Sequence, residues 1–282
     1  MKSKFKDSLV GRTVNFEIYP LSFQEFLLFK GVPFAPASRF TEKKTKELQG
    51  LYTEFALYGG YPRIVLTPET DLKEKYLQQI IDTYIRKDIR ALAEIRDVTK
   101  FNHLLEILAS QSVNLVNVSE LSNTCRIARV TIERYLFLLE QTYILRLVRP
   151  FSHNILTELF KTPKIFFFDT GLMQMLWLKS LQKELLGHVF ETSIFAELVK
   201  RYGASQVHYW RTQDKKEIDF VVSLPNTNLP IEAKLNFPRA IPAVLNTFDA
   251  VYRSKGSPVP GYKLVGLNGQ PAEDGMVFPW QV

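Results

Sequence analysis

Two short runs of alternating apolar and polar residues constrain the fold of this chain most strongly. One extends from Glu217 to Val222 and the other from Pro230 to Lys234, and a Pro/Asn turn separates them. Alternation over a few residues, interrupted by turn residues, predicts the two strands of a hairpin. The sequence therefore predicts a β-sheet region organised around residues 208–234.

Charged residues recur at alternate positions of both predicted strands. Since side chains alternate across a strand, Glu217 and Asp219 are expected on one face. The opposite face would then carry Ile218, Phe220 and Val222. On the second strand Glu232 and Lys234 share a face.

If the two polar faces coincide, two carboxylates and an amine converge at one place. Such carboxylate oxygens suit a hard cation such as Mg²⁺, and the lysine could orient or activate water against a phosphodiester. The alternative is an ordinary amphipathic hairpin with solvated charges.

Size and composition narrow the class of protein. A chain of 282 residues predicts two or three structural units. A formal charge of +7 favours an anionic partner such as nucleic acid without requiring one. Cys125 is the single cysteine, which excludes an intramolecular disulfide and a cysteine-based zinc site. Neither a signal-peptide core nor an uncharged spanning run is present, so we expect a cytoplasmic protein without membrane contact.

Several further segments have a motif-like composition. They read YPLSFQEF (19–26), YGGYPRIVL (58–66), YIRKDIRALAEIRD (84–97), IFFFDTGL (165–172), GHVFE (187–191) and HYWRTQDKKEIDFVV (208–222). Together they resemble the C-terminal half of prokaryotic AAA-type ATPases of the domain of unknown function 4143 family. The resemblance covers nearly all of the chain. It implies that residues 1–30 are the remnant end of an AAA ATPase core.

The ATPase signature itself is missing from the chain. A phosphate-binding loop needs Gly-x-x-x-x-Gly-Lys-Ser/Thr, and no such run occurs. ATP is therefore not expected to bind without a P-loop half, and the chain is expected to be truncated. A strand expected over 13–19 would lack partners, which agrees with truncation. Arg12 is either a remnant sensor or finger arginine or a surface residue.

The Asp…Glu-x-Lys pattern resembles the core of PD-(D/E)XK, or restriction-nuclease-like, enzymes. That resemblance implies an upstream helical glutamate in a Gly-x-x-x-Glu setting, which Glu191 matches, with Glu197 as a spare. The implied catalytic residues are Glu191, Asp219, Glu232 and Lys234, with Mg²⁺ held by the three carboxylates.

Residues 31–98 are expected to form a helical lid or linker. YGGYP is interpreted as a turn and not as a phosphate loop, and an apolar stripe predicts one long helix over 76–96.

Residues 99–150 resemble a winged helix-turn-helix with a third helix beginning at Arg129. Ser119 is the expected N-cap of its second helix. Arg126, Arg129 and Arg134 would contact DNA phosphates. The family commonly has glycine at the position of Arg126 and serine at that of Ala128. The alternative is a module that packs or docks against protein.

Residues 151–282 are predicted to be the nuclease-like domain, with the order α-β-β-β-α-β. Asp169 is expected to cap a helix, or else to be a further acid at the site. His188 and His208 lie nearby in sequence and are not expected to be ligands.

The predicted class is thus a multi-domain α/β protein: lid, winged helix, then α/β sandwich. Three functions remain open, namely a metal-dependent nuclease, a non-catalytic interaction platform for nucleic acid or protein, and the regulatory half of an ATPase. Close approach of the four polar groups would favour the first, and splayed or ion-paired groups the second.

Overall fold

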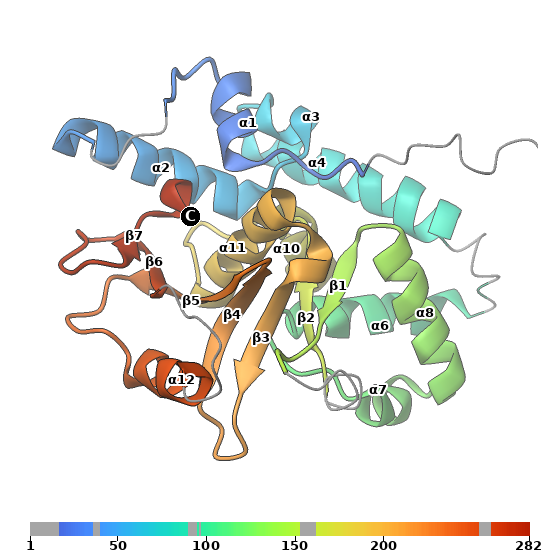
Figure 1. Ribbon diagram of the computed structural model, residues 1–282. Helices are drawn as coiled ribbons and strands as arrows, with labels where there is room; N and C mark the ends of the chain where they lie inside the picture. The colour runs from blue at the N-terminus through green and yellow to red at the C-terminus, as the bar shows by residue number, and fades with distance from the viewer. Residues whose placement is uncertain (1–16, 36–39, 90–94, 96, 153–161, 254–260) are drawn as a thin grey trace, which may run out of the picture.

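A helical N-terminal region precedes a mixed sheet (Figure 1). The computed structural model describes residues 17–35, 40–89, 95, 97–152, 162–253 and 261–282. The first helices are α1 (Phe23–Phe29), α2 (Glu42–Tyr58), α3 (Pro62–Val65), α4 (Thr70–Ile80), the π-helix η1 (Ile81–Ile89), α6 (Val98–Ser110), α7 (Val118–Cys125) and α8 (Arg129–Gln141). The single long helix expected over 76–96 is therefore wrong in part, because a π-helix follows at Ile81; residues 90–94 and 96 lie outside the described residues.

Most of the segment before α1, on which the truncation hypothesis depends, lies outside the described residues. Arg12 and residues 13–16 of the expected strand lie outside the described residues, and residues 17–19 are not in a strand. Ser22 caps α1 and forms a capping box with Glu25, a start signal that is legible in the sequence SFQE.

Two groups of strands form the centre of the molecule. β1 (Leu145–Val148) and β2 (Lys164–Phe167) pair antiparallel. The larger sheet has the order β3-β4-β5-β6-β7, with strands Val207–Arg211, Glu217–Leu224, Thr227–Asn236, Lys263–Asn268 and Met276–Val277. The first three pair antiparallel, whereas β6 and β7 join in parallel. A bridge between Pro150 and Tyr209 connects the two groups.

The remaining helices are α10 (Thr170–Leu178), α11 (Gly187–Tyr202) and α12 (Ala243–Arg253), with short 3₁₀ turns at Ala204–Gln206 and Pro279–Gln281. Of these helices, α11 and α12 pack on the larger sheet, whereas α10 packs in the helical core. From α11 onward the order is α-β-β-β-α-β, as predicted. No helix among the described residues is long and apolar enough to cross a membrane.

Strand β2 separates two hydrophobic cores. Its residues are all buried, and successive side chains face opposite sides of a strand. Ile165 and Phe167 pack into the core that contains α6, α8 and α10. Phe166 packs into the core of α11 and the larger sheet, where its ring lies 4.6 Å from that of Phe195 and 5.3 Å from that of Phe220. One strand therefore ties the helical region to the sheet.

The YGGYP segment is a structural junction. Gly59 ends α2 with a φ of 81°, and a Cβ there would lie 2.3 Å from the carboxylate of Asp169. Gly60 donates its N–H to Asp169 Oδ2 at 2.7 Å, while Leu172 N–H donates to Oδ1 at 2.8 Å. Asp169 thus caps α10, as the first of its two expected roles required, and both its oxygens are engaged by backbone donors.

Helices α6, α7 and α8 adopt the predicted helical succession, and α8 buries Ile132, Leu136 and Leu139. The N-cap of α7 is Asn117, whose side chain accepts from two backbone N–H groups, so the expectation for Ser119 is wrong. Arg126 ends α7 in the left-handed conformation with a φ of 53°. That conformation favours glycine, which gives a physical reason for the family preference there.

Candidate active site

A β-bulge places Asp219. The β3–β4 register pairs His208 with Val221 but Trp210 with Ile218, so Tyr209 stands opposite two residues, Asp219 and Phe220. A bulge of this kind breaks the alternation of side chains and re-aims one of them.

The break in alternation changes which hydrophobic cluster each side chain of β4 enters. Ile218 packs with α12 in a cluster that includes Phe248, whereas Phe220 and Val222 pack on the α11 side. The expectation that Ile218, Phe220 and Val222 share one face is therefore wrong, because the sequence pattern does not reveal the bulge.

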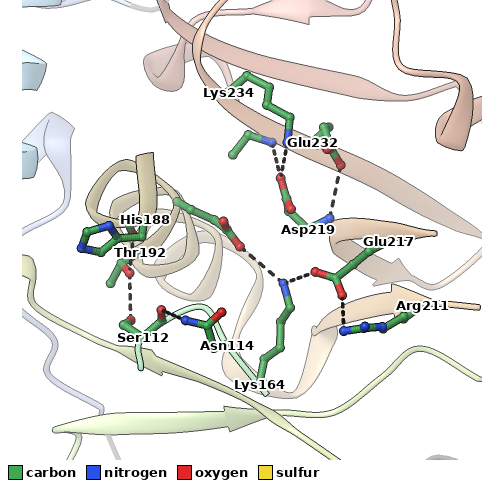
Figure 2. A network of polar contacts seen from close by, with 12 residues as sticks. Ser112, Asn114, Lys164, His188, Thr192, Arg211, Glu217, Asp219, Glu232 and Lys234 are labelled. Carbon is green, nitrogen blue, oxygen red and sulfur yellow. Dashed lines mark hydrogen bonds and ion pairs between the residues drawn. The ribbon is translucent and has the colours of Figure 1, made fainter. Parts of the chain in front are cut away.

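Asp219, Glu232 and Lys234 converge, as expected (Figure 2). Lys234 Nζ lies 2.6 Å from Glu232 Oε1 and 3.6 Å from Asp219 Oδ2. Asp219 N–H donates to Glu232 Oε2 at 3.3 Å, and Ala233 N–H donates to Asp219 Oδ2 at 2.9 Å. The two acids are buried, whereas the Lys234 side chain is 45% exposed. The lysine therefore forms the solvent side of the group.

Glu191 extends from the first turns of α11 and pairs with a different lysine. Its Oε1 lies 3.6 Å from Nζ of Lys164 on β2. That oxygen is buried and has no hydrogen-bond partner among the described residues. Burial raises the pKa of Glu191 to about 8, and the negative charge of Asp219 adds to the increase.

Burial and like charge also act on the second acid. Burial, followed by the charge of Asp219, raises the pKa of Glu232 to about 7. The pKa of Lys234 is raised, because Asp219 and Glu232 outweigh the opposing effect of burial. Three carboxylates in one buried region thus repel one another, and a cation brought among them would be stabilised.

Glu217 does not join this group. Its carboxylate is held between Lys164 Nζ, at 2.6 Å from Oε1, and Arg211 Nη1, at 3.1 Å from Oε2. The shared face expected for Glu217 and Asp219 is therefore not realised as one acidic site, since the bulge lies at Asp219. Figure 2 shows Glu217 directed to Lys164 and Arg211, and Asp219 directed to Lys234.

As placed, no three His, Cys, Asp or Glu side chains in the described part of the chain lie close enough to hold a metal ion. The donor chemistry nevertheless fits Mg²⁺, since Glu191, Asp219 and Glu232 supply only carboxylate oxygens. One of these, Glu191 Oε1, is a buried acceptor without a hydrogen bond. Lys164 and Lys234 balance the charges that a cation would otherwise balance.

The other expected residues lie elsewhere. Glu197 accepts from Phe23 N–H at 2.9 Å and pairs with Lys200 at 3.0 Å, which is a structural role. His188 packs edge-on against Trp177, with ring centroids 5.4 Å apart, and burial lowers its pKa.

The arginines expected to contact DNA, Arg126, Arg129 and Arg134, are exposed at the α7–α8 turn and along α8. Their role stays a prediction.

Lys164 is the residue that the sequence interpretation missed. It is 4% exposed and contacts Glu191 and Glu217 from a strand that lies distant in sequence from both. The available signal was a lysine directly before the apolar run IFFF, because buried lysines are rare unless they are paired.

Residues 186–281 match a domain of unknown function, DUF4143. The chain carries a DUF4143 domain. The candidate site residues Glu191, Asp219, Glu232 and Lys234 all fall inside it. Residues 49–184 match a second domain of unknown function, DUF8612, which includes Lys164.

Relatives of this chain occur in bacteria and archaea. An uncharacterized protein of Haemophilus influenzae is 32% identical over 82% of this chain and 55% of its own length. An uncharacterized protein of Methanocaldococcus jannaschii is 27% identical over 81% of this chain and 52% of its own length. The chain thus spans about half the length of these relatives. No solved structure matches it significantly.

Proposed function

We propose that the DUF4143 region is a metal-dependent nuclease that hydrolyses phosphodiester bonds of DNA. The observation that carries the proposal is the convergence of two buried carboxylates, Asp219 and Glu232, with the half-exposed Lys234. Ordinary solvated hairpin charges would not be buried, because burial of a carboxylate is unfavourable unless it is paired or used. The bulge at Asp219 supports the proposal, since bulges often re-aim side chains beside active sites.

Each residue has a role in this proposal. Asp219, Glu232 and Glu191 would hold Mg²⁺, which when bound polarises the phosphate and lowers the pKa of water. Lys234 presents an ammonium at the solvent side of the group, where it can orient a phosphate oxygen or an attacking water. The order of elements from α11 to β6 supports a restriction-nuclease-like fold.

DNA would be held by the α6–α8 region acting as a winged helix. Arg126, Arg129 and Arg134 are exposed where a recognition helix would meet phosphates, and the net charge of +7 favours an anionic partner. An ATPase half, in a further domain or on a partner, would act on this module. The relatives are longer than the span they share with this chain, which leaves room for such a domain.

A non-catalytic interaction platform is the second candidate. The acids are ion-paired to Lys234 and Lys164, which is the arrangement expected of such a platform and can be stable without metal. On α8, Val130 and Phe137 are 77% and 57% exposed, which suits protein docking better than contact with phosphates.

Cleavage of labelled single- and double-stranded DNA with Mg²⁺ or Mn²⁺ separates the two candidates. The variants Asp219→Asn and Lys234→Ala should lose metal-dependent cleavage. Asp214→Asn and Lys216→Ala change an exposed ion pair in the β3–β4 connection and should retain it. Absence of cleavage by the folded protein at every metal concentration would contradict the nuclease and favour the platform.

A further inference from the structure

One side chain crosses from the DUF8612 region into the candidate site of the DUF4143 region. Lys164 lies on β2, within residues 49–184, and its ammonium contacts Glu191 and Glu217, which lie within residues 186–281. The side chain is 5% exposed, so its charge is not balanced by bulk water.

The two contacts of Lys164 differ in strength. The 2.6 Å separation from Glu217 Oε1 is that of a short charge-assisted contact. The 3.6 Å separation from Glu191 Oε1 exceeds hydrogen-bond range, so no hydrogen bond joins these two groups. Separating Lys164 from Glu191 therefore costs less free energy than separating it from Glu217.

We propose that Lys164 is an internal counter-ion that competes with a divalent cation for Glu191. The inference rests on the proposed metal site and states how that site is regulated. While Lys164 lies beside Glu191, it balances the charge of that carboxylate separately from the charges of Asp219 and Glu232. When a cation binds, Glu191 leaves Lys164 and joins the other two carboxylates.

Glu217 makes this exchange physically reasonable. After Glu191 leaves, Lys164 keeps its short contact with Glu217, so no unpaired buried ammonium results. Arg211 holds Glu217 from its other oxygen at 3.1 Å, which keeps that acid beside Lys164. Lys164 belongs to β2, which pairs with β1 directly after α8, so the counter-ion comes from outside the DUF4143 region.

Binding of Mn²⁺, followed by electron paramagnetic resonance, tests the inference. Repulsion between an ammonium and a divalent cation a few ångströms apart exceeds a factor of ten in affinity, even at the dielectric constant effective in proteins. We therefore expect Lys164→Met to bind Mn²⁺ roughly tenfold or more tightly than wild type. Lys200→Met is the matched control, because it removes a lysine whose side chain is only 10% exposed and is paired with a glutamate of α11, and it should leave affinity unchanged.

The outcomes separate this inference from the proposed function. One outcome would overturn the counter-ion role alone. In it, wild type binds Mn²⁺, Asp219→Asn abolishes the binding, and a folded Lys164→Met binds no more tightly than wild type. No binding to either protein, or binding that survives Asp219→Asn, would overturn the metal site and the inference with it. Lys164→Gln, whose amide can still donate to Glu217, serves if the methionine variant does not fold.

Discussion

The junction at Asp169 allows a quantitative test of the fold. In Asp169→Ala, the N–H groups of Leu172 and Gly60 lose their acceptors at 2.8 and 2.7 Å. Loss of an N-cap costs about 1 kcal/mol, and a buried N–H left unpaired costs about 1–3 kcal/mol more. We expect the free energy of unfolding to fall by about 2–4 kcal/mol in urea denaturation followed by circular dichroism.

The variant Asp169→Asn refines this test, because its amide retains one acceptor oxygen for the two N–H donors. The expected loss is about 1–2 kcal/mol. A loss below about 0.5 kcal/mol in the alanine variant would refute the capping role, since that is the range of unremarkable surface changes.

The pH dependence of the free energy of unfolding is an independent test of the Asp169 carboxyl. Burial raises the pKa of Asp169 above its unfolded value, although two backbone donors oppose the effect. The folded state therefore binds the proton more tightly, and this contribution to stability is fully present below the unfolded pKa and is lost as pH rises through the folded pKa. The difference in stability between wild type and Asp169→Asn should thus be larger near pH 4.5 than at pH 7. An unchanged or smaller difference at the lower pH would contradict the raised pKa.

Four further substitutions test the helix termini and the close packing, each by urea denaturation. Ala128→Ser should raise the free energy of unfolding by about 1 kcal/mol, because α8 has no side-chain cap; no gain would mean that the serine does not accept the free N–H. Asn117→Ala should lower it by about 1 kcal/mol and Ser119→Ala by much less, and the reverse order would contradict the assigned cap. Gly171→Ala should lower the free energy of unfolding by about 1–3 kcal/mol, since a Cβ would lie 2.2 Å from the carbonyl oxygen of Tyr58. An unchanged free energy would show that the backbone around Gly171 and Tyr58 can move to accept the methyl group.

The sequence predicted much of this structure because local signals were strong. The hairpin, the capped helix at Ser22 and the order of elements after Glu191 follow from alternation, turn residues and caps, which act over a few positions. Alternation also predicted that Glu232 and Lys234 share a face, whereas Asp219 joins them at a bulge that alternation does not predict.

The missed features depend on contacts between distant segments. A bulge at Asp219 is set by the register of β3 against β4, and periodicity within one strand carries no record of it. Lys164 reaches Glu191 only through the packing of β2 against α11. At α7, Asn117 and Ser119 are both good caps, so composition alone could not choose between them.

Strand β2 has a consequence for how this protein can be divided. The boundary between the two matched families falls at residue 185, yet Phe166 lies on one side of it and its ring neighbours Phe195 and Phe220 lie on the other. A fragment that begins at residue 186 would uncover that aromatic packing and leave Glu217 without its lysine. The two families are thus separable as sequences but inseparable as folded bodies, so neither half can be exchanged between relatives unless β2 is exchanged with it.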